Sequence, residues 1–350
     1  MKKAVIYSVV LCAVSWIAAL VFCNATGFDG TQVDVAMRSS YTIFATAYMF
    51  LPMIVALAMQ LICKGDKPFD NTLGLLRFRP RWSWLVGALL VPVAVLLCAG
   101  IASLFVEPVS MAESIRMQVT ATLGDGPAAE EALKEVMAVP SWVMGLGAIL
   151  SGLVAGATIN AVAAFGEEYG WRNYLVGALR HQKFLPASLF IGAVWGIWHA
   201  PMILLMGHNY PNDRLLGVGL MVVMCILLGV LELYFVIKSG SVYPSAIIHG
   251  PFNGISGMTV LWFPTGGATT TAMTGVAGFV ALAIVIAALW LYDRKHDKIF
   301  CSIIEQKLRI ENLPSPKLGE GGRRPGEVCK RAERAERAER AERAERENIY

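Results

Sequence analysis

The chain has 350 residues, of which 56% are hydrophobic and 16% charged, and its formal net charge is only +4. One soluble core could not bury that much apolar surface, so a soluble globular protein is excluded and lipid must solvate most of the chain. The small net charge implies no nucleic-acid partner.

Apolar segments long enough to cross a bilayer, which takes about twenty residues per helix, recur along the chain. They predict an all-α, polytopic membrane protein with about eight transmembrane helices. The expected spans are 4–23, 41–63, 83–106, 141–164, 184–206, 215–237, 242–263 and 273–292. The first follows Lys2 and Lys3 as a secretory signal would, but its length and the absence of a small-x-small cleavage site predict a retained helix.

The loop charges predict how these spans are oriented. Cytoplasmic loops collect Lys and Arg, and with Lys2 and Lys3 inside, the basic connections all fall on the cytoplasmic side. The acidic connection at 107–140 then falls outside. Eight spans with both termini cytoplasmic satisfy every loop, and the predicted location is the cell membrane.

The composition changes near residue 299. Residues 1–298 are predicted to form the transmembrane domain, and 299–350 a cytoplasmic low-complexity tail. Five Ala-Glu-Arg triplets run from Ala332 to Arg346, and no apolar stripe exists to dock a helix formed by them. The tail is therefore left out of the functional interpretation.

The first polar motif inside the apolar spans is Glu167-Glu168-Tyr-Gly-Trp-Arg172. In a continuous helix Glu168 and Arg172 lie one turn apart and can pair, while Glu167 points about 100° away. A held carboxylate beside a free one suits a general base with its structural neighbour. The alternative is an interfacial helix end with snorkelling charges.

The second motif is Trp195-Gly-Ile-Trp-His199-Ala-Pro201, well inside the fifth span. His199 lies one turn from Trp195 and is either a catalytic or a packing histidine. Pro201 cannot donate to the carbonyl of Ile197, so a kink with a freed acceptor is expected there.

The third motif is His249-Gly-Pro251-Phe-Asn253 in the seventh span. His249 and Asn253 are four residues apart, so both side chains are expected to project from one helix face as paired hydrogen-bond donors. The alternative role is contact between helices, with the neighbouring glycines allowing a close approach.

Ionisable groups at membrane depth cost roughly 2.5 to 3.5 kcal/mol each, so together these clusters indicate function. Little else ionisable lies deep in the membrane apart from Glu232. Such a set can activate water and stabilise an oxyanion, and it could also bind a divalent metal such as zinc, with Glu167, His199 and His249 as candidate ligands. The His-Glu-x-x-His spacing of a readable zinc site is missing, so both mechanisms stay open.

The three motifs resemble those of the CAAX protease and bacteriocin-processing family of intramembrane peptidases, which includes type II prenyl endopeptidases. Its Glu-Glu-x-x-x-Arg and His-x-x-x-Asn motifs are complete, while Trp195 stands in the Phe place of Phe-x-x-x-His, a departure expected to concern packing and not chemistry. The resemblance covers about 141–263, and the family's usual eight helices agree with the span count.

This resemblance implies a role for each matched residue. Glu167 activates the attacking water and His199 helps to bind it. His249 and Asn253 stabilise the tetrahedral oxyanion, and Glu168 with Arg172 holds the geometry.

The implied activity is hydrolysis of a peptide bond in a membrane-associated or prenylated peptide, with membrane lipid as the other partner. Two alternatives remain. One is a non-catalytic family member acting in bacteriocin self-immunity or as a membrane scaffold, and the other is a proton-coupled transporter.

Overall fold

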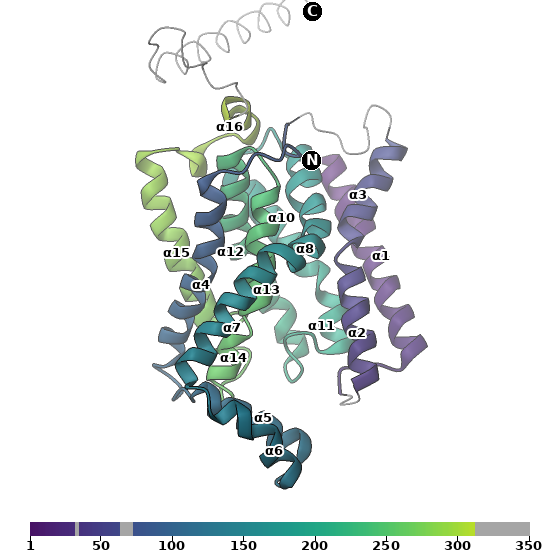
Figure 1. The fold of residues 1–350 in the computed structure, drawn as a ribbon. Helices are drawn as coiled ribbons and strands as arrows, with labels where there is room; N and C mark the ends of the chain where they lie inside the picture. Colours follow the sequence, from purple (N-terminus) through teal and green to yellow (C-terminus); the bar gives the residue numbers. More distant parts are fainter. Residues whose placement is uncertain (32–34, 64–72, 312–350) are drawn as a thin grey trace, which may run out of the picture. The chain divides into compact units, whose positions relative to one another are not determined.

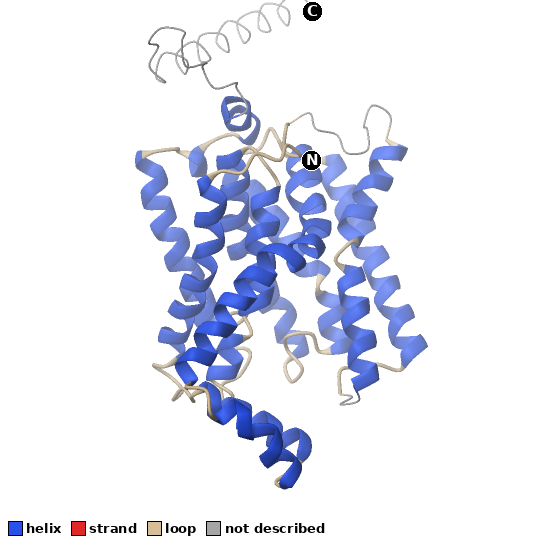
Figure 2. Cartoon of the chain, in the orientation of Figure 1, coloured by secondary structure: helices blue, strands red, loops and turns tan. Residues whose placement is uncertain are grey.

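The computed structural model describes residues 1–31, 35–63 and 73–311, and it confirms the predicted all-α class. Within these ranges every regular element is a helix (Figure 2), and one isolated bridge joins Lys183 to Ile303. All these helices belong to one unit, Met1–Asn312. The predicted Ala-Glu-Arg triplets lie outside the described residues.

Seven helices or continuous helix runs in the described ranges are long and apolar enough to cross a membrane, and they match seven of the predicted spans. The chain is therefore a multi-pass membrane protein. The runs are α1 (Lys2–Thr26), α2 with α3 (Val35–Tyr48, Leu51–Ile62), α4 (Trp82–Ala102), α7 to α9 with two π-helical segments (α7 Ser141–Ala155, η1 Gly156–Asn160, α8 Ala161–Glu168, η2 Tyr169–Tyr174, α9 Leu175–Ala178), α10 with α11 (Phe184–Trp198, Ala200–Met206), α12 (Arg214–Ser239) and α15 (Val276–Lys295).

The outer faces of these helices are apolar, as lipid requires. On α1, for example, Val9 is 64% exposed and Ile17 is 62% exposed. Side chains of this kind would face water at a high cost in a soluble protein, whereas in a bilayer they meet hydrocarbon.

The expected span 242–263 is divided into two helices, α13 (Tyr243–Ile255) and α14 (Met258–Trp262). Pro251 within α13 has no N–H and removes one intrahelical hydrogen bond. Gly257 then lies at the break, where a residue of low helix propensity favours the end of α13.

The two short helices together still run from one end of the bundle to the other. The amide of Val242, just before α13, donates to the carbonyl of Leu75, which precedes α4. The amide of Val109, which follows α4, donates to the carbonyl of Trp262 at the end of α14. Because α4 is itself long enough to span, these two contacts mark opposite ends of the bundle, and α13 with α14 connects them.

Figure 1 shows where the remaining short helices lie. The N-terminus and α16 (Ile304–Glu311) are at one end of the bundle, while α5 (Met111–Leu123) and α6 (Pro127–Met137) are at the other. An even number of crossings agrees with this arrangement. The assignment of the first end to the cytoplasm stays a prediction.

Glycines let two pairs of elements approach closely around the centre of the bundle. A Cβ atom on Gly250 of α13 would clash with the carbonyl oxygen of Gly156 in η1. On α10, a Cβ atom on Gly192 or Gly196 would clash with the backbone of α12. The polar residues of α8, α10, α12 and α13 are consequently brought within contact of one another.

Candidate active site

Glu167, near the end of α8, is held by two indole N–H groups. Its Oε2 accepts from Nε1 of Trp195 at 2.7 Å and from Nε1 of Trp171 at 3.3 Å. The side chain is buried, and among the described residues no hydrogen bond reaches its Oε1. One carboxylate oxygen is therefore anchored, and the other is left to act on a substrate or a water.

Glu168 points to a different set of partners, as the helical spacing predicts. Its Oε1 accepts from NH1 of Arg172 at 3.1 Å and from Nδ1 of His249 at 2.9 Å. NH2 of Arg172 forms a second ion pair, with Oε2 of Glu232 on α12. Glu168, Arg172, Glu232 and His249 form what we call the buried network, and no member is more than 3% exposed.

The hydrogen bonds of this network fix where the hydrogens lie. A carboxylate only accepts, so Nδ1 of His249 must carry a hydrogen and its Nε2 is the nitrogen left to face a ligand. Oε2 of Glu168 and Oε1 of Glu232 are buried without a hydrogen-bond partner in the described part of the chain. Burying carboxylate oxygens without hydrogen-bond partners lowers the stability of the fold. Their presence therefore indicates selection for something other than stability.

His199 lies between α10 and α11. The helix is interrupted there, as expected from Pro201, which has no N–H to donate. Its Nδ1 is 2.9 Å from the carbonyl oxygen of Trp195. Because a carbonyl only accepts, Nδ1 carries the hydrogen, and in the neutral ring Nε2 keeps its lone pair. His199 therefore presents an acceptor.

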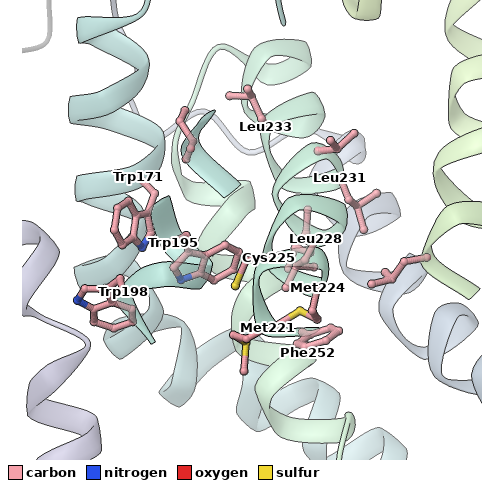
Figure 3. Close-up of a cluster of buried hydrophobic side chains, with 14 of the residues drawn as sticks. Trp171, Trp195, Trp198, Met221, Met224, Cys225, Leu228, Leu231, Leu233 and Phe252 are labelled. Carbon is pink, nitrogen blue, oxygen red and sulfur yellow. The ribbon is translucent and has the colours of Figure 1, made fainter. Parts of the chain in front are cut away.

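Trp195 connects all these groups. Besides its bond to Glu167, its ring lies 4.4 Å below the guanidinium carbon of Arg172 and 5.2 Å from the ring of His249. Figure 3 shows Trp171, Trp195 and Trp198 gathered beside Cys225. The sequence interpretation, that Trp in place of Phe concerns packing alone, is wrong, since Phe has no N–H to give Glu167.

Asn253 is placed apart from the other motif residues. It is exposed, and its side chain makes no hydrogen bond to any residue that the structure describes, whereas His249 one turn earlier is buried. The structure thus brings together five of the six predicted site residues, Glu167, Glu168, Arg172, His199 and His249, around Trp195, and leaves Asn253 outside their hydrogen bonds.

A divalent metal does not fit these residues well. In the described ranges the one group with ligand atoms close together is Glu168, Glu232 and His249, within 4.8 Å of one another. The predicted ligands Glu167 and His199 are not part of it. Arg172 already pairs with both carboxylates, so its positive charge would repel a cation held there.

Two partners were missed by the sequence interpretation. Glu232 was noted only as a deep ionisable group, although the cost of burying it already indicated a partner. The family motif carries Phe in the place of Trp195, so it gave no sign that an indole N–H would donate to Glu167. Only the side-chain contacts between helices, Trp195 to Glu167 and Glu232 to Arg172, identify what each residue meets.

Comparison with models of protein families gives a match. The family model described as type II CAAX prenyl endopeptidase Rce1-like covers residues 137–255, a range that contains all three motifs and Glu232. No curated protein matches the chain at a significant level.

Proposed function

Because residues 137–255 place this chain in the CAAX protease family, we propose that it is an intramembrane endopeptidase in which Glu167 activates the attacking water. The observation that carries the proposal is the asymmetric hold on Glu167. Two indole donors fix Oε2, and Oε1 is left without a hydrogen bond from the described residues.

In this proposal Oε1 of Glu167 takes one proton from the water, while Nε2 of His199 accepts a hydrogen bond from the O–H that remains. The oxygen attacks the carbonyl carbon of the scissile peptide bond, and the carbonyl becomes an oxyanion. Glu167 then gives its proton to the amide nitrogen, the C–N bond breaks, and a carboxylic acid and an amine leave.

His249 is the proposed donor to the oxyanion, through the N–H at Nε2 that its protonated ring carries. The carboxylate of Glu168 at Nδ1 supports that protonated form and fixes the orientation of the ring. Arg172 and Glu232 in turn hold Glu168. Asn253, exposed one turn beyond His249, is proposed to join the oxyanion contact when a substrate is bound.

The proposed substrate is a membrane-associated or prenylated peptide. A prenyl group on a C-terminal C-a-a-X cysteine partitions into hydrocarbon, so it would bring the scissile bond to a site built within membrane helices. The position of Glu167 and His199 on helix runs long enough to span supports this class of substrate, and His249 on α13 reaches the same site through Glu168.

The test is cleavage of a farnesylated C-a-a-X peptide and of a fluorogenic peptide library by detergent-purified protein. Parent protein is expected to cleave, Glu167→Gln to lose at least about a thousandfold in kcat, and chelator to leave the parent rate unchanged. Equal cleavage by parent and Glu167→Gln would refute the proposal. A well-folded parent that cleaves nothing would favour a scaffold or immunity protein instead.

A further inference from the structure

His208 belongs to none of the three motifs, yet it lies against His199. It lies in the connection between α11 and α12, directly after Gly207, which adopts a left-handed conformation with a φ of 69° and ends α11. Its ring is nearly parallel to that of His199, with the centroids 6.3 Å apart and 11° between the planes. The chain therefore turns back at Gly207, which places the imidazole of His208 parallel to that of His199.

Tyr41 on α2 holds this second imidazole. Its hydroxyl oxygen is 2.6 Å from Nδ1 of His208, across 167 positions of the sequence. Tyr41 is itself stacked on Phe28, with the centroids 4.9 Å apart and 17° between the planes. Burial lowers the pKa of His208 to about 4, so the ring is neutral at neutral pH and its bond to Tyr41 is one between uncharged groups.

The other contacts of His199 leave some rotation of its imidazole about the bond to Cβ, and His208 can restrict that rotation. Nδ1 is tied to the Trp195 carbonyl, and the Trp198 ring stands perpendicular to the imidazole at 4.8 Å. Rotation about the bond between the imidazole and its Cβ would tilt the ring plane and turn the lone pair of Nε2 away from the water. A flat ring lying parallel to His199 opposes that rotation, provided that its own plane is fixed.

We propose that Tyr41 and His208 are positioning residues, with the tyrosine fixing the plane of His208 and His208 fixing the plane of His199 so that Nε2 stays directed at the attacking water. The inference rests on the proposed function and extends the site to α2. Tyr41 lies outside residues 137–255, so the segment that matches the family model does not contain the whole of this arrangement.

The first experiment compares Tyr41→Phe and His208→Phe with matched controls. Tyr292 and His296 at the end of α15 also stack, at 4.0 Å and 9°, but both are exposed, so Tyr292→Phe and His296→Phe are the controls. Each site variant is expected to lower kcat by about tenfold to a hundredfold, as misplacement of a catalytic group by about 1 Å does, with KM changed less than about twofold. The double variant should be no slower than His208→Phe, because both act through one bond.

The second experiment needs no turnover. Protein labelled with nitrogen-15 at histidine is studied by NMR in detergent micelles, and His199→Gln identifies the His199 signals. Tyr41→Phe is expected to shift or broaden them, while Tyr292→Phe leaves them in place.

Together the two experiments distinguish failure of the proposed function from failure of the positioning role of Tyr41 and His208. If the parent cleaves nothing, the proposed function fails and the His199 signals still decide whether Tyr41 and His208 hold that ring. If Glu167→Gln abolishes cleavage but Tyr41→Phe and His208→Phe match their controls, the positioning role is overturned. His199 signals unmoved by Tyr41→Phe also overturn it.

Discussion

Two clusters in this molecule use the same kinds of side chain in opposite surroundings. The buried network combines two glutamates, an arginine and a histidine between membrane helices. At the end of the bundle that carries α16, what we call the outer network combines Glu305 with Arg180, His181 and Arg309. The side chains of Arg172 and Glu168 are fully buried, whereas that of Arg309 is 76% exposed.

The difference shows that burial, and not the number of ion pairs, decides what such a cluster is for. Ion pairs exposed to water contribute about 0 to 1 kcal/mol each, and their partners are easily replaced by solvent. Buried pairs rarely repay their desolvation, yet removal of one partner leaves an uncompensated charge. The outer network attaches α16 to Arg180 and His181. The buried network lowers the stability of the fold, and the proposed peptidase site explains why it is present.

The largest effect is expected from Arg172→Met, which removes the shared cation and keeps most of the apolar volume. Glu168 and Glu232 would then be buried without their counterion, so the free energy of unfolding should fall by about 3 to 5 kcal/mol. Denaturant unfolding in detergent micelles measures this. Arg309→Met is the matched control and should cost less than about 1 kcal/mol. Equal losses in the two variants would remove the distinction between the networks.

A smaller effect is expected from Trp195→Phe, which keeps an aromatic ring over Arg172 but removes the donor to Glu167. A hydrogen bond to a charged group is worth about 1.5 to 3 kcal/mol, so kcat should fall by about tenfold to a hundredfold with little change in KM. The control is Trp290→Phe, since Trp290 lies 4.9 Å from the guanidinium carbon of Arg294 on an exposed face. An unchanged kcat in Trp195→Phe would return this residue to a packing role.

Parts of the site could be predicted because they depend on one helix. The pairing of Glu168 with Arg172, the different direction of Glu167 and the interruption near Pro201 follow from helical spacing and from the missing proline N–H. The number of crossings follows from lengths of apolar sequence. Each of these is a local property of the chain.

What could not be predicted depends on contacts between helices. Glu232 meets Arg172 only because the arginine side chain reaches α12 from another segment, and Tyr41 meets His208 from a helix far away in sequence. Helical spacing likewise placed His249 and Asn253 on one face, but neighbouring helices cover only His249. Period and spacing determine which way a side chain leaves its own helix, and they do not determine what it meets.

The smallest effect concerns the outer network and acid. Partial burial alone would raise the pKa of Glu305, but the hydrogen bond and charge of Arg309, with the charges of His181 and Arg180, bring that pKa below its ordinary value. A lowered carboxyl pKa stabilises the folded state above the unfolded pKa, and this stability is lost as pH falls through the folded pKa. Acidification from about pH 6 to about pH 3 should therefore weaken the attachment of α16 by less than about 1 kcal/mol. Hydrogen exchange at the amide of Glu305, which donates to the carbonyl of Arg180, measures this, and Glu305→Gln should abolish the dependence. The same acid sensitivity in Glu305→Gln would assign it to another group.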